Sequence, residues 1–477
     1  MTVVHRSVSI ASLCALALLA SLTLALRTGA QEGAAAAANS IRGAMEFLAS
    51  DALRGRGSAT QDELVAATYI AAQLRQSGIE PAGADGGYLQ RVAMERQELA
   101  AAPVLEIAGV RWTHGREMLV VAMAHPELAG PLEKIDAQRD GLPTALRPGA
   151  IVFLTPRTGA GAPSRNQQAQ DLVRKGAVAV LLEASAQAKA RWEEIGNQLP
   201  GLPIRFKEMP EQPKSSELTA VALSAEAATK LAQVPDGASV RLAAPVRQTI
   251  LETTWNVLGR LRGTGAASSE EAVLLSAHLD HLGVGAAVKG DSIYNGADDD
   301  ASGVVAVLEL ARALAAGPQP KRTVLFALFG SEERGGLGSA FFLEHPPVAL
   351  ETIVANLEFE MIGRPDPAVQ PKTLWLTGYE RSNLGAELAG HGARLVADPH
   401  PREHFFERSD NYVLAKMGVV AHTVSSYGLH KEYHHPSDDL SHIDFAHMKE
   451  AIASMVEPVR WLANSDFRPQ WAEGKRP

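Results

Sequence analysis

The chain of 477 residues contains one cysteine, Cys14, and has no surplus of positive charge. Its 45 Lys and Arg stand against 54 Asp and Glu, which gives a formal net charge of −9. Proteins bind nucleic acid largely through basic side chains, so this balance argues against a nucleic-acid partner. Internal repeats and low-complexity arrays are also lacking. With 46% hydrophobic and 21% charged residues, the composition excludes a disordered or collagen-like chain.

Cys14 lies inside an apolar run over residues 8–26. A basic lead precedes this run and small residues follow it, so residues 1–30 are expected to be a secretory signal peptide. One alternative is an uncleaved membrane anchor, because the run is close to the minimum length of a spanning helix. A lipoprotein signal is a further alternative, for which Leu13 is an unfavourable neighbour. Cleavage would give a secreted or periplasmic protein without stable membrane contact and without a thiol for disulfides, metal binding or catalysis.

The rest of the chain is expected to form one interrupted domain and one inserted domain. Residues 31–99 show helical patterns and begin the main domain, which resumes over residues 249–466. Residues 467–477 form a C-terminal tail. Between the two parts, residues 100–248 change to short strand-like stretches, including a β-α-β pattern over residues 149–182.

Short apolar runs alternate with helical patterns in the second part of the main domain. Strands are expected at residues 273–277, 323–329, 353–359 and 418–424, and an amphipathic helix at residues 302–315. Buried strands separated by helices indicate an α/β fold with a mostly parallel sheet between two helical layers. Ligands of such sheets bind beyond the carboxyl ends of the strands.

Potential metal ligands follow these predicted strands one after another. They are His278-Leu279-Asp280-His281, Asp298-Asp299-Asp300 ahead of the helix, Glu332-Glu333 and Glu360. His278 and Asp280 are two residues apart and project to the same side of an extended chain. Repetition of acids at successive strand ends favours a common site over solvated loop charges. The three aspartates have a simpler alternative role, capping of the next helix, in particular by Asp300 or Ser302.

A histidine-rich stretch near the C-terminus is a second source of imidazole. It contains His430, His434, His435, His442 and His447. The spacing of His430 and His434 would suit two ligands on a helix, but Gly428 and Pro436 argue against a helix there. We therefore expect a loop that presents one histidine, with most of the others at the surface.

Oxygen and imidazole donors without thiolates suit a catalytic zinc or a related divalent ion. Two ions that share one carboxylate would explain the surplus of acids. Within Glu332-Glu333, one carboxylate can bind metal while its neighbour accepts a proton from water.

These motifs resemble those of the secreted dizinc aminopeptidases, whose relatives include aminopeptidase Y, glutamate carboxypeptidase and glutaminyl cyclase. The shared motifs are His-x-Asp, the acidic loop before Ser-Gly, Glu-Glu after a strand, and Tyr-His-x-Pro, and they cover about residues 256–460. The resemblance implies a phosphorylase/hydrolase-like fold, peptide substrates and two Zn²⁺ per chain.

The resemblance also implies a ligand for each metal position. His278 would bind one zinc ion, Asp299 would bridge both ions, and Glu333 would bind the second together with His434. Glu360 stands where the family usually has Asp, and it keeps the carboxylate with a longer reach. This departure leaves open whether the enzyme requires a free amino terminus.

Three further roles follow from the same resemblance. Glu332 would be the general base, and Tyr433 would stabilise the oxyanion of the tetrahedral intermediate. Asp280 would orient His278 and fix its tautomer. The segment Arg408-Ser409-Asp410 resembles a family segment near the substrate pocket, but helix capping explains it equally well, and it stays outside this set.

The region over residues 149–182 resembles the protease-associated domain that is often inserted in these enzymes, through the segment Arg174-Lys175-Gly176-Ala177-Val178-Ala179-Val180. An ordinary β-α-β unit is the alternative. The leading functional interpretation is a zinc-dependent aminopeptidase. A glutaminyl cyclase-type transferase with one zinc ion and a non-catalytic binding homologue are the alternatives. Endopeptidase or carboxypeptidase action, side-chain preference and oligomeric state stay open.

Overall fold

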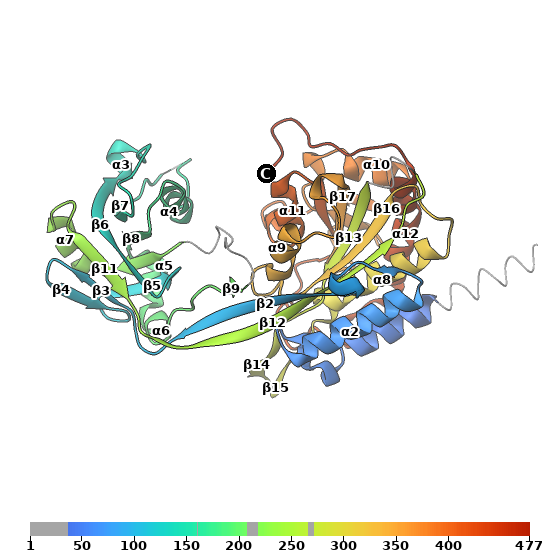
Figure 1. The fold of residues 1–477 in the computed structure, drawn as a ribbon, viewed down its shortest axis with the longest axis horizontal. Coiled ribbons are helices and arrows are strands. Elements are labelled where there is room, and N and C mark those ends of the chain that lie inside the picture. Colours follow the sequence, from blue (N-terminus) through green and yellow to red (C-terminus); the bar gives the residue numbers. More distant parts are fainter. Residues whose placement is uncertain (1–36, 160, 208–217, 266–270) are drawn as a thin grey trace, which may run out of the picture. The chain divides into compact units, whose positions relative to one another are not determined.

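The computed structural model describes residues 37–159, 161–207, 218–265 and 271–477. The predicted signal segment and Cys14 lie outside the described residues. The chain divides into two compact units, which are Met1–Val92 with Thr254–Pro477, and Ala93–Thr253 (Figure 1). Among the described residues, no helix combines the length and apolar character needed to cross a membrane.

The larger unit is built on a sheet that is parallel at its centre. Its strands run in the order β19 (Leu395–Ala397), β18 (Leu374–Leu376), β20 (Ala421–Ser425), β17 (Ile353–Phe359), β13 (Ala272–His278), β16 (Thr323–Phe329), β12 (Val246–Leu261) and β2 (Leu89–Leu99). The four strands from β20 to β16 are parallel, and β18 and β12 flank them in antiparallel orientation. The carboxyl ends of β13, β16 and β17 therefore meet at one edge.

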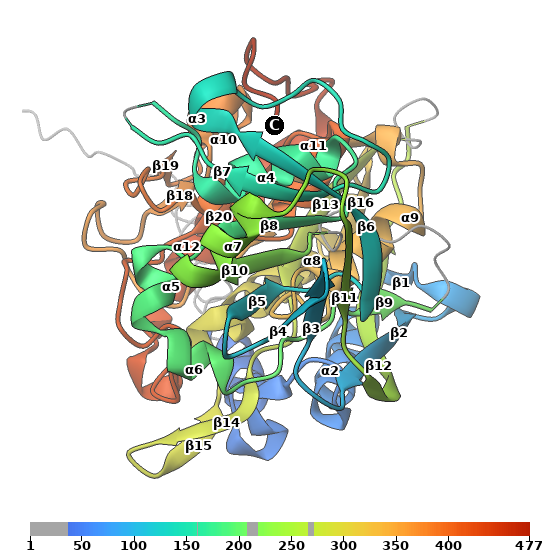
Figure 2. The same ribbon diagram turned by 90° about the vertical axis from the view of Figure 1, so that its left-hand side faces the viewer.

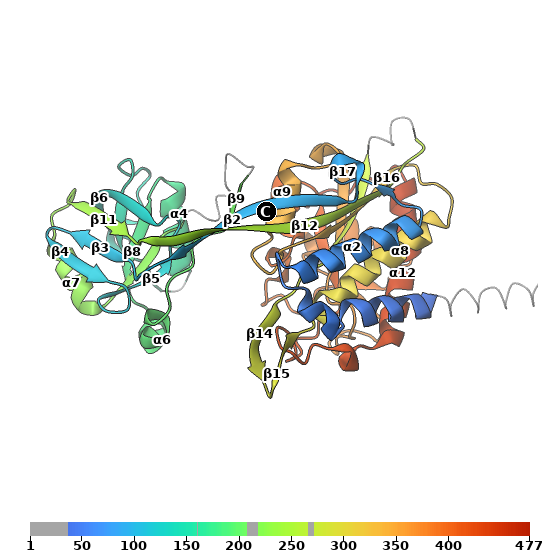
Figure 3. The same ribbon diagram turned by 60° about the horizontal axis from the view of Figure 1, so that its bottom comes forward.

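Helices cover both faces of this sheet. One layer consists of α2 (Gln61–Gln76), α8 (Gly303–Ala315) and α12 (Phe445–Asn464), which lie near one another in Figure 3. The other consists of α9 (Leu337–Glu344) and α11 (Asn411–Met417), which contact each other, while α10 (Leu384–Gly390) contacts α12. Residues 37–48 are also helical.

The two hydrophobic cores explain why the central strand β16 is an almost continuous apolar run in the sequence. In β16, Val324, Phe326 and Leu328 belong to the core under α2, α8 and α12, whereas Leu325 and Phe329 belong to the core on the opposite face. A strand buried on both faces has no polar side, so its sequence does not alternate. The predicted α/β class is confirmed, and the strands over residues 323–329 and 353–359 have their expected bounds.

Shorter elements complete the larger unit. They are the 3-10 turns η1 (Asp51–Arg56), η2 (Ala84–Gly86), η5 (Leu350–Thr352), η6 (Tyr379–Arg381), η7 (Phe405–Glu407) and η8 (Leu440–His442), the π-helical turn η4 (Ala297–Ser302), and β1 (Glu80–Pro81). Between β13 and η4 the chain forms an antiparallel hairpin of β14 (Gly283–Val288) and β15 (Asp291–Tyr294).

The second unit has its own eight-stranded sheet. The order is β4 (Val110–Thr113), β3 (Val104–Ile107), β11 (Ser239–Ala243), β6 (Glu127–Asp136), β7 (Ile151–Thr155), β8 (Ala179–Glu183), β10 (Ala220–Leu223) and β5 (Met118–Ala122). The strands β6, β7, β8 and β10 are parallel (Figure 2). Around them lie α3 (Ala137–Asp140), α4 (Arg165–Arg174), α5 (Ala186–Ala190), α6 (Trp192–Gly196) and α7 (Ala225–Gln233). The short strand β9 (Arg205–Phe206) belongs to the other sheet, where it pairs with β2 in antiparallel orientation.

The predicted β-α-β pattern of this unit corresponds to β7, α4 and β8. A capping box at Ser164 fixes the start of α4, because the Ser164 hydroxyl accepts from the Gln167 N–H and the Gln167 side chain accepts from the Ser164 N–H. The identification of this unit as a protease-associated domain stays a prediction.

Candidate metal centre

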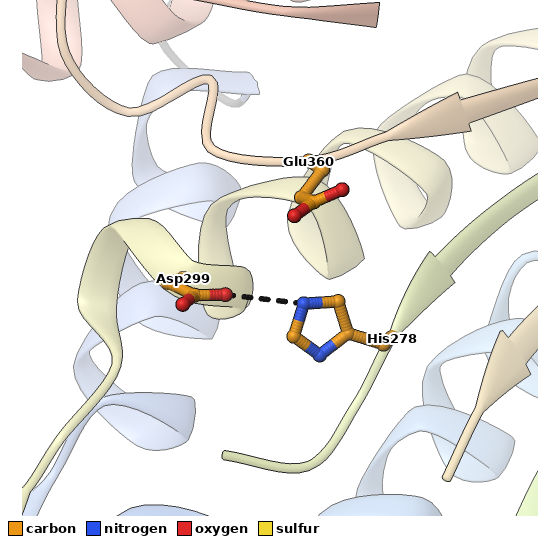
Figure 4. Close-up of side chains that lie close together, drawn as sticks. All are labelled: His278, Asp299 and Glu360. Atoms are coloured by element: carbon orange, nitrogen blue, oxygen red, sulfur yellow. Dashed lines mark ion pairs between the residues drawn. The ribbon is translucent and has the colours of Figure 1, made fainter. Parts of the chain in front are cut away.

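Three strand ends and two loops bring the predicted metal ligands together. His278 ends β13, Glu333 follows β16, Glu360 follows β17, Asp299 lies in η4 ahead of α8, and His434 lies in the loop before η8. Figure 4 shows three of these side chains converging from separate elements. The parallel sheet explains this convergence, since its carboxyl ends share one edge.

Asp299 lies between two groups of ligands. Its Oδ1 is 3.1 Å from Nε2 of His278, and its Oδ2 is 3.2 Å from Nε2 of His434. Nε2 of His434 is also 3.2 Å from Oε2 of Glu333. Two ligands bound 2.0–2.1 Å from one tetrahedral zinc ion stand about 3.3 Å apart, so these separations suit pairs of ligands around a common ion.

Two groups of donors that share Asp299 are thus present. We name them the Glu360 group, made of His278, Asp299 and Glu360, and the Glu333 group, made of Asp299, Glu333 and His434. The donor atoms of the Glu360 group all lie within 4.8 Å of one another (Figure 4). Nε2 of His278 is buried and forms no hydrogen bond with any residue that the structure describes. A bound cation would compensate such an atom, which is costly when left unpaired.

The electrostatics of the site favour added positive charge. Burial by itself lowers the pKa of His434, but the carboxylates of Asp299 and Glu333 raise it to about 10. Burial, together with the charges of Asp299 and Asp410, raises the pKa of Glu360 to about 7. The pKa of Glu332 is raised well above its usual value, first by burial and then by neighbouring carboxylates. An oxygen and imidazole donor set with this excess of acids fits a divalent cation such as zinc.

Hydrogen bonds explain which of the three consecutive aspartates faces the site. Asp298 accepts from the Gly363 N–H at 2.8 Å and lies 2.9 Å from Nε2 of His430. Asp300 accepts from the N–H of Gly303, at the start of α8, at 3.0 Å. Asp300 therefore binds the first N–H of α8, while Asp299 points at the metal ligands.

Left-handed backbone conformations position three of the loops at the site. Ser331, before Glu332, has φ 53°; Met361, after Glu360, has φ 52°; and His434 has φ 55°. Such values are uncommon for residues other than glycine and carry a strain that the surrounding structure has to balance. At Ser331 and Met361 they turn the chain just after β16 and β17, and at His434 they turn it within the loop before η8.

The carboxylate of Asp280 holds the segment that carries Glu332 and Glu333. Its Oδ1 accepts from the Glu332 N–H at 2.9 Å, and its Oδ2 accepts from the Glu333 N–H at 3.4 Å and from the Ser58 hydroxyl. Nδ1 of His278 lies 3.3 Å from the backbone carbonyl oxygen of Asp280. The nearest carboxylate oxygen of Asp280 is farther from this nitrogen, at 3.8 Å.

Residues from the N-terminal part of the larger unit, to which the sequence assigned no role, support the site. Arg56 is fully buried and donates to the backbone carbonyls of Leu279, Asn295 and Gly296 at 3.0, 2.6 and 3.0 Å. A guanidinium with several donors can hold several loops at once. In the sequence Arg56 stands between two glycines, and nothing there indicates its contact with residues more than 200 positions away.

Two buried carboxylates support the site in the same way. Asp438 accepts from the N–H groups of Asp298 and Asp299, at 3.0 Å from each. Glu63, on α2, accepts from the Ser331 N–H at 3.2 Å and from the Thr254 hydroxyl. Neither residue belongs to a motif that could have identified it.

The expectation that most of the remaining histidines lie at the surface was wrong for two of them. His430 is nearly buried, and its ring lies between Asp298 and Glu432, 2.9 and 3.5 Å from their carboxylate oxygens. His447 is buried on α12 and pairs with the Ser426 hydroxyl at 3.0 Å. The residue type alone does not predict whether a histidine is buried, because that depends on which partners the fold places around its ring.

A pocket opens beside the Glu360 group. Its lining comprises Glu360, Met361, Trp375, Thr377, Phe405, Arg408, Ser409, Thr423, Ser425, Tyr427 and Tyr433. Tyr433 stacks on His434 with 3.9 Å between ring centroids, and burial raises the pKa of its phenol, which keeps the hydroxyl protonated as a donor. The segment Arg408-Ser409-Asp410 contributes two lining residues, and Asp410 accepts from the Ser339 hydroxyl.

Comparison with known proteins gives three matches that inform the fold and the family. An aminopeptidase structure from Aneurinibacillus sp. strain AM-1 matches with a TM-score of 0.52 at 17% identity, covering 90% of this chain and 95% of that one, which shows a shared fold. Aminopeptidase YwaD of Bacillus subtilis is 24% identical over 228 residues, or 46% of this chain and 47% of the relative. A vacuolar membrane protease of Candida tropicalis is 41% identical over 213 residues, or 44% of this chain and 22% of the relative.

These matches span less than half of the length of both curated relatives. The model of peptidase family M28 matches residues 256–458, the stretch that contains all five predicted metal ligands. The resemblance to the zinc aminopeptidases that the motifs indicated is thereby confirmed. Residues 256–458 of this chain are thus similar to peptidase family M28.

Proposed function

We propose that this chain is a zinc-dependent exopeptidase that removes amino-terminal residues from peptides. The observation that carries the proposal is the pair of ligand groups around Asp299, because their separations suit two ions bridged by one carboxylate. His278 and Glu360 would complete one position, and Glu333 and His434 the other. Bound zinc would supply Lewis-acid polarisation of a carbonyl oxygen and make a neighbouring water molecule more acidic.

Glu332 is the proposed general base. It is half-buried, its backbone N–H is held by Asp280, and its carboxylate lies within electrostatic reach of His278 and Glu360. It would take the proton of the attacking water and return that proton to the leaving amine. The protonated hydroxyl of Tyr433 would donate a hydrogen bond to the oxyanion that forms on the scissile carbonyl.

The pocket beside Glu360 is the proposed site for the side chain of the amino-terminal residue. Trp375, Phe405 and Tyr427 give it aromatic walls. Glu360 also lines the pocket, so its carboxylate is available to a substrate ammonium group as well as to a metal ion. We therefore expect peptides with free amino termini and apolar first residues to be the preferred substrates.

The test compares Glu332→Gln with wild type on leucine p-nitroanilide and on its N-acetylated form. The substitution keeps the size of the side chain but removes the base, so kcat should fall by about 10²- to 10⁴-fold. Zinc content should stay at about two equivalents per chain, and Glu457→Gln, an exposed glutamate on α12, is the matched control. Near wild-type turnover of Glu332→Gln, or equal cleavage of the acetylated substrate, would contradict the proposal.

A further inference from the structure

His281 is a buried histidine beside the Glu333 group that none of the proposed roles uses. It follows β13 by three residues, and its side chain is 0% exposed. Its backbone N–H donates to the Arg56 carbonyl at 3.1 Å. The ring packs against Gly296, where a Cβ atom would stand 2.6 Å from two ring carbons. These contacts fix the position of the imidazole.

Nδ1 of His281 lies close to two acidic oxygens without forming a hydrogen bond to either. Nδ1 is 2.8 Å from Oε1 of Glu333 and 3.8 Å from Oδ2 of Asp299. Both ring nitrogens, and Oε1 of Glu333, form no hydrogen bond within the part of the chain that the structure describes. A separation of 2.8 Å without a hydrogen bond means that the N–H direction is not aligned with the oxygen. Nδ1 of His281 and Oε1 of Glu333 have this arrangement if both are directed at a metal ion between them rather than at each other.

We propose that His281 is a further metal ligand, through Nδ1, in the Glu333 group. The inference rests on the proposed two-ion function and extends it, because it makes the two positions unequal. The Glu333 group would then offer two imidazoles, from His281 and His434, and the Glu360 group one, from His278. Added imidazole strengthens binding of zinc, so the ion of the Glu333 group should be the more tightly held of the two.

A hydrogen bond from Nδ1 of His281 to Glu333 is the competing role, and two substitutions separate it from ligation. In His281→Asn the amide can stand near the position of Nδ1 and donate to Glu333, but an amide is a poor ligand for zinc. His281→Ala removes both capacities. His435→Asn is the matched control, since His435 lies next to His434 but bonds to Ser437 through Nδ1 at 2.7 Å.

The measurement is zinc affinity, by titration of the metal-free full chain in competition with a chromophoric chelator. We expect both His281 variants to weaken the tighter site by about 100-fold or more and His435→Asn to leave both sites unchanged. Affinity within threefold of wild type in both variants, or restoration by Asn, would overturn the proposal. Since the readout is zinc binding, loss of peptidase activity alone would count against the proposed function and leave this inference intact.

A second measurement does not depend on a variant that folds. In crystals of the zinc-loaded wild-type chain, anomalous scattering at the zinc edge locates the ions. Nδ1 of His281 should lie about 2.0–2.1 Å from one ion. A separation above about 3 Å, with Nδ1 turned to Glu333, would show the hydrogen-bonding role instead and refute ligation.

Discussion

Replacement of Asp280 by Asn tests how the Glu332-Glu333 segment is held. The carboxylate accepts from the N–H groups of Glu332 and Glu333 and from the Ser58 hydroxyl. An amide has only one acceptor oxygen, so Asn can keep the bond to Glu332, while its NH₂ group would face the Glu333 N–H. One buried donor then loses its acceptor, which costs about 1–3 kcal/mol.

If that cost falls on the transition state, kcat/KM should drop by about 5- to 150-fold. The assay is hydrolysis of leucine p-nitroanilide by Asp280→Asn after reconstitution with zinc. Ser58→Ala, which removes one bond to Asp280 and leaves both backbone bonds, should show a smaller loss. Asp136→Asn is the matched control, because Asp136 also accepts from two backbone N–H groups, at 3.2 Å each, but in the second unit.

Two outcomes would refute this reasoning about Asp280. The first is kcat/KM of Asp280→Asn within twofold of wild type, which would mean that the carboxylate does not position the segment. The second is a loss in Ser58→Ala as large as in Asp280→Asn, which would assign the effect to the Ser58 contact rather than to the backbone bonds.

The remaining predictions concern stability. The pKa of His422 is lowered from 6.5 to about 4 by burial. Between these pH values the unfolded chain binds a proton at His422 and the folded chain does not. The free energy of unfolding of wild type should therefore fall by about 3 kcal/mol relative to that of His422→Gln as pH falls from 6.5 to 4. A constant difference between the two proteins in urea unfolding across this range would contradict the prediction. Arg56→Lys should lower stability by about 3–5 kcal/mol, because an ammonium cannot reach the same carbonyls; a shift below 1 kcal/mol in urea unfolding would contradict this. Removal of zinc by a chelator should lower the Tm. Zinc added back at 100 times its Kd should raise the free energy of unfolding by about 2.7 kcal/mol. A Tm that does not respond to zinc would argue against a zinc site in the folded chain.

The layered fold could be predicted from the sequence because its signals are local. The strand β16 is a short apolar run between Arg322 and Gly330, and β17 is a short, mostly apolar run that ends before Glu360, so their bounds followed from local patterns. The predicted ligands His278 and Glu360 lie directly at strand ends, so the parallel sheet brings them together without any further information. A local pattern combined with one topological rule is sufficient for this part of the site.

The supporting residues could not be predicted, because their partners lie far away in the sequence. Glu63 bonds to Ser331 across 268 positions, and Asp438 bonds to Asp299 across 139. A single acid on an amphipathic helix reads as a solvated charge, since its burial depends on which loop the tertiary structure packs against it. The same reason explains why His430 was expected at the surface.

The buried contacts of Arg56 have a consequence for the order in which the chain folds during synthesis. Gly296, one of its carbonyl partners, lies 240 positions later. At about 5–20 residues per second, translation delivers that partner about 10–50 s after Arg56, and until then the guanidinium has to remain in water. The contiguous unit Ala93–Thr253 is complete in the interval. We therefore expect the inserted unit to fold first, on the ribosome, before the strands that pack against the early helices of the discontinuous unit have been synthesised.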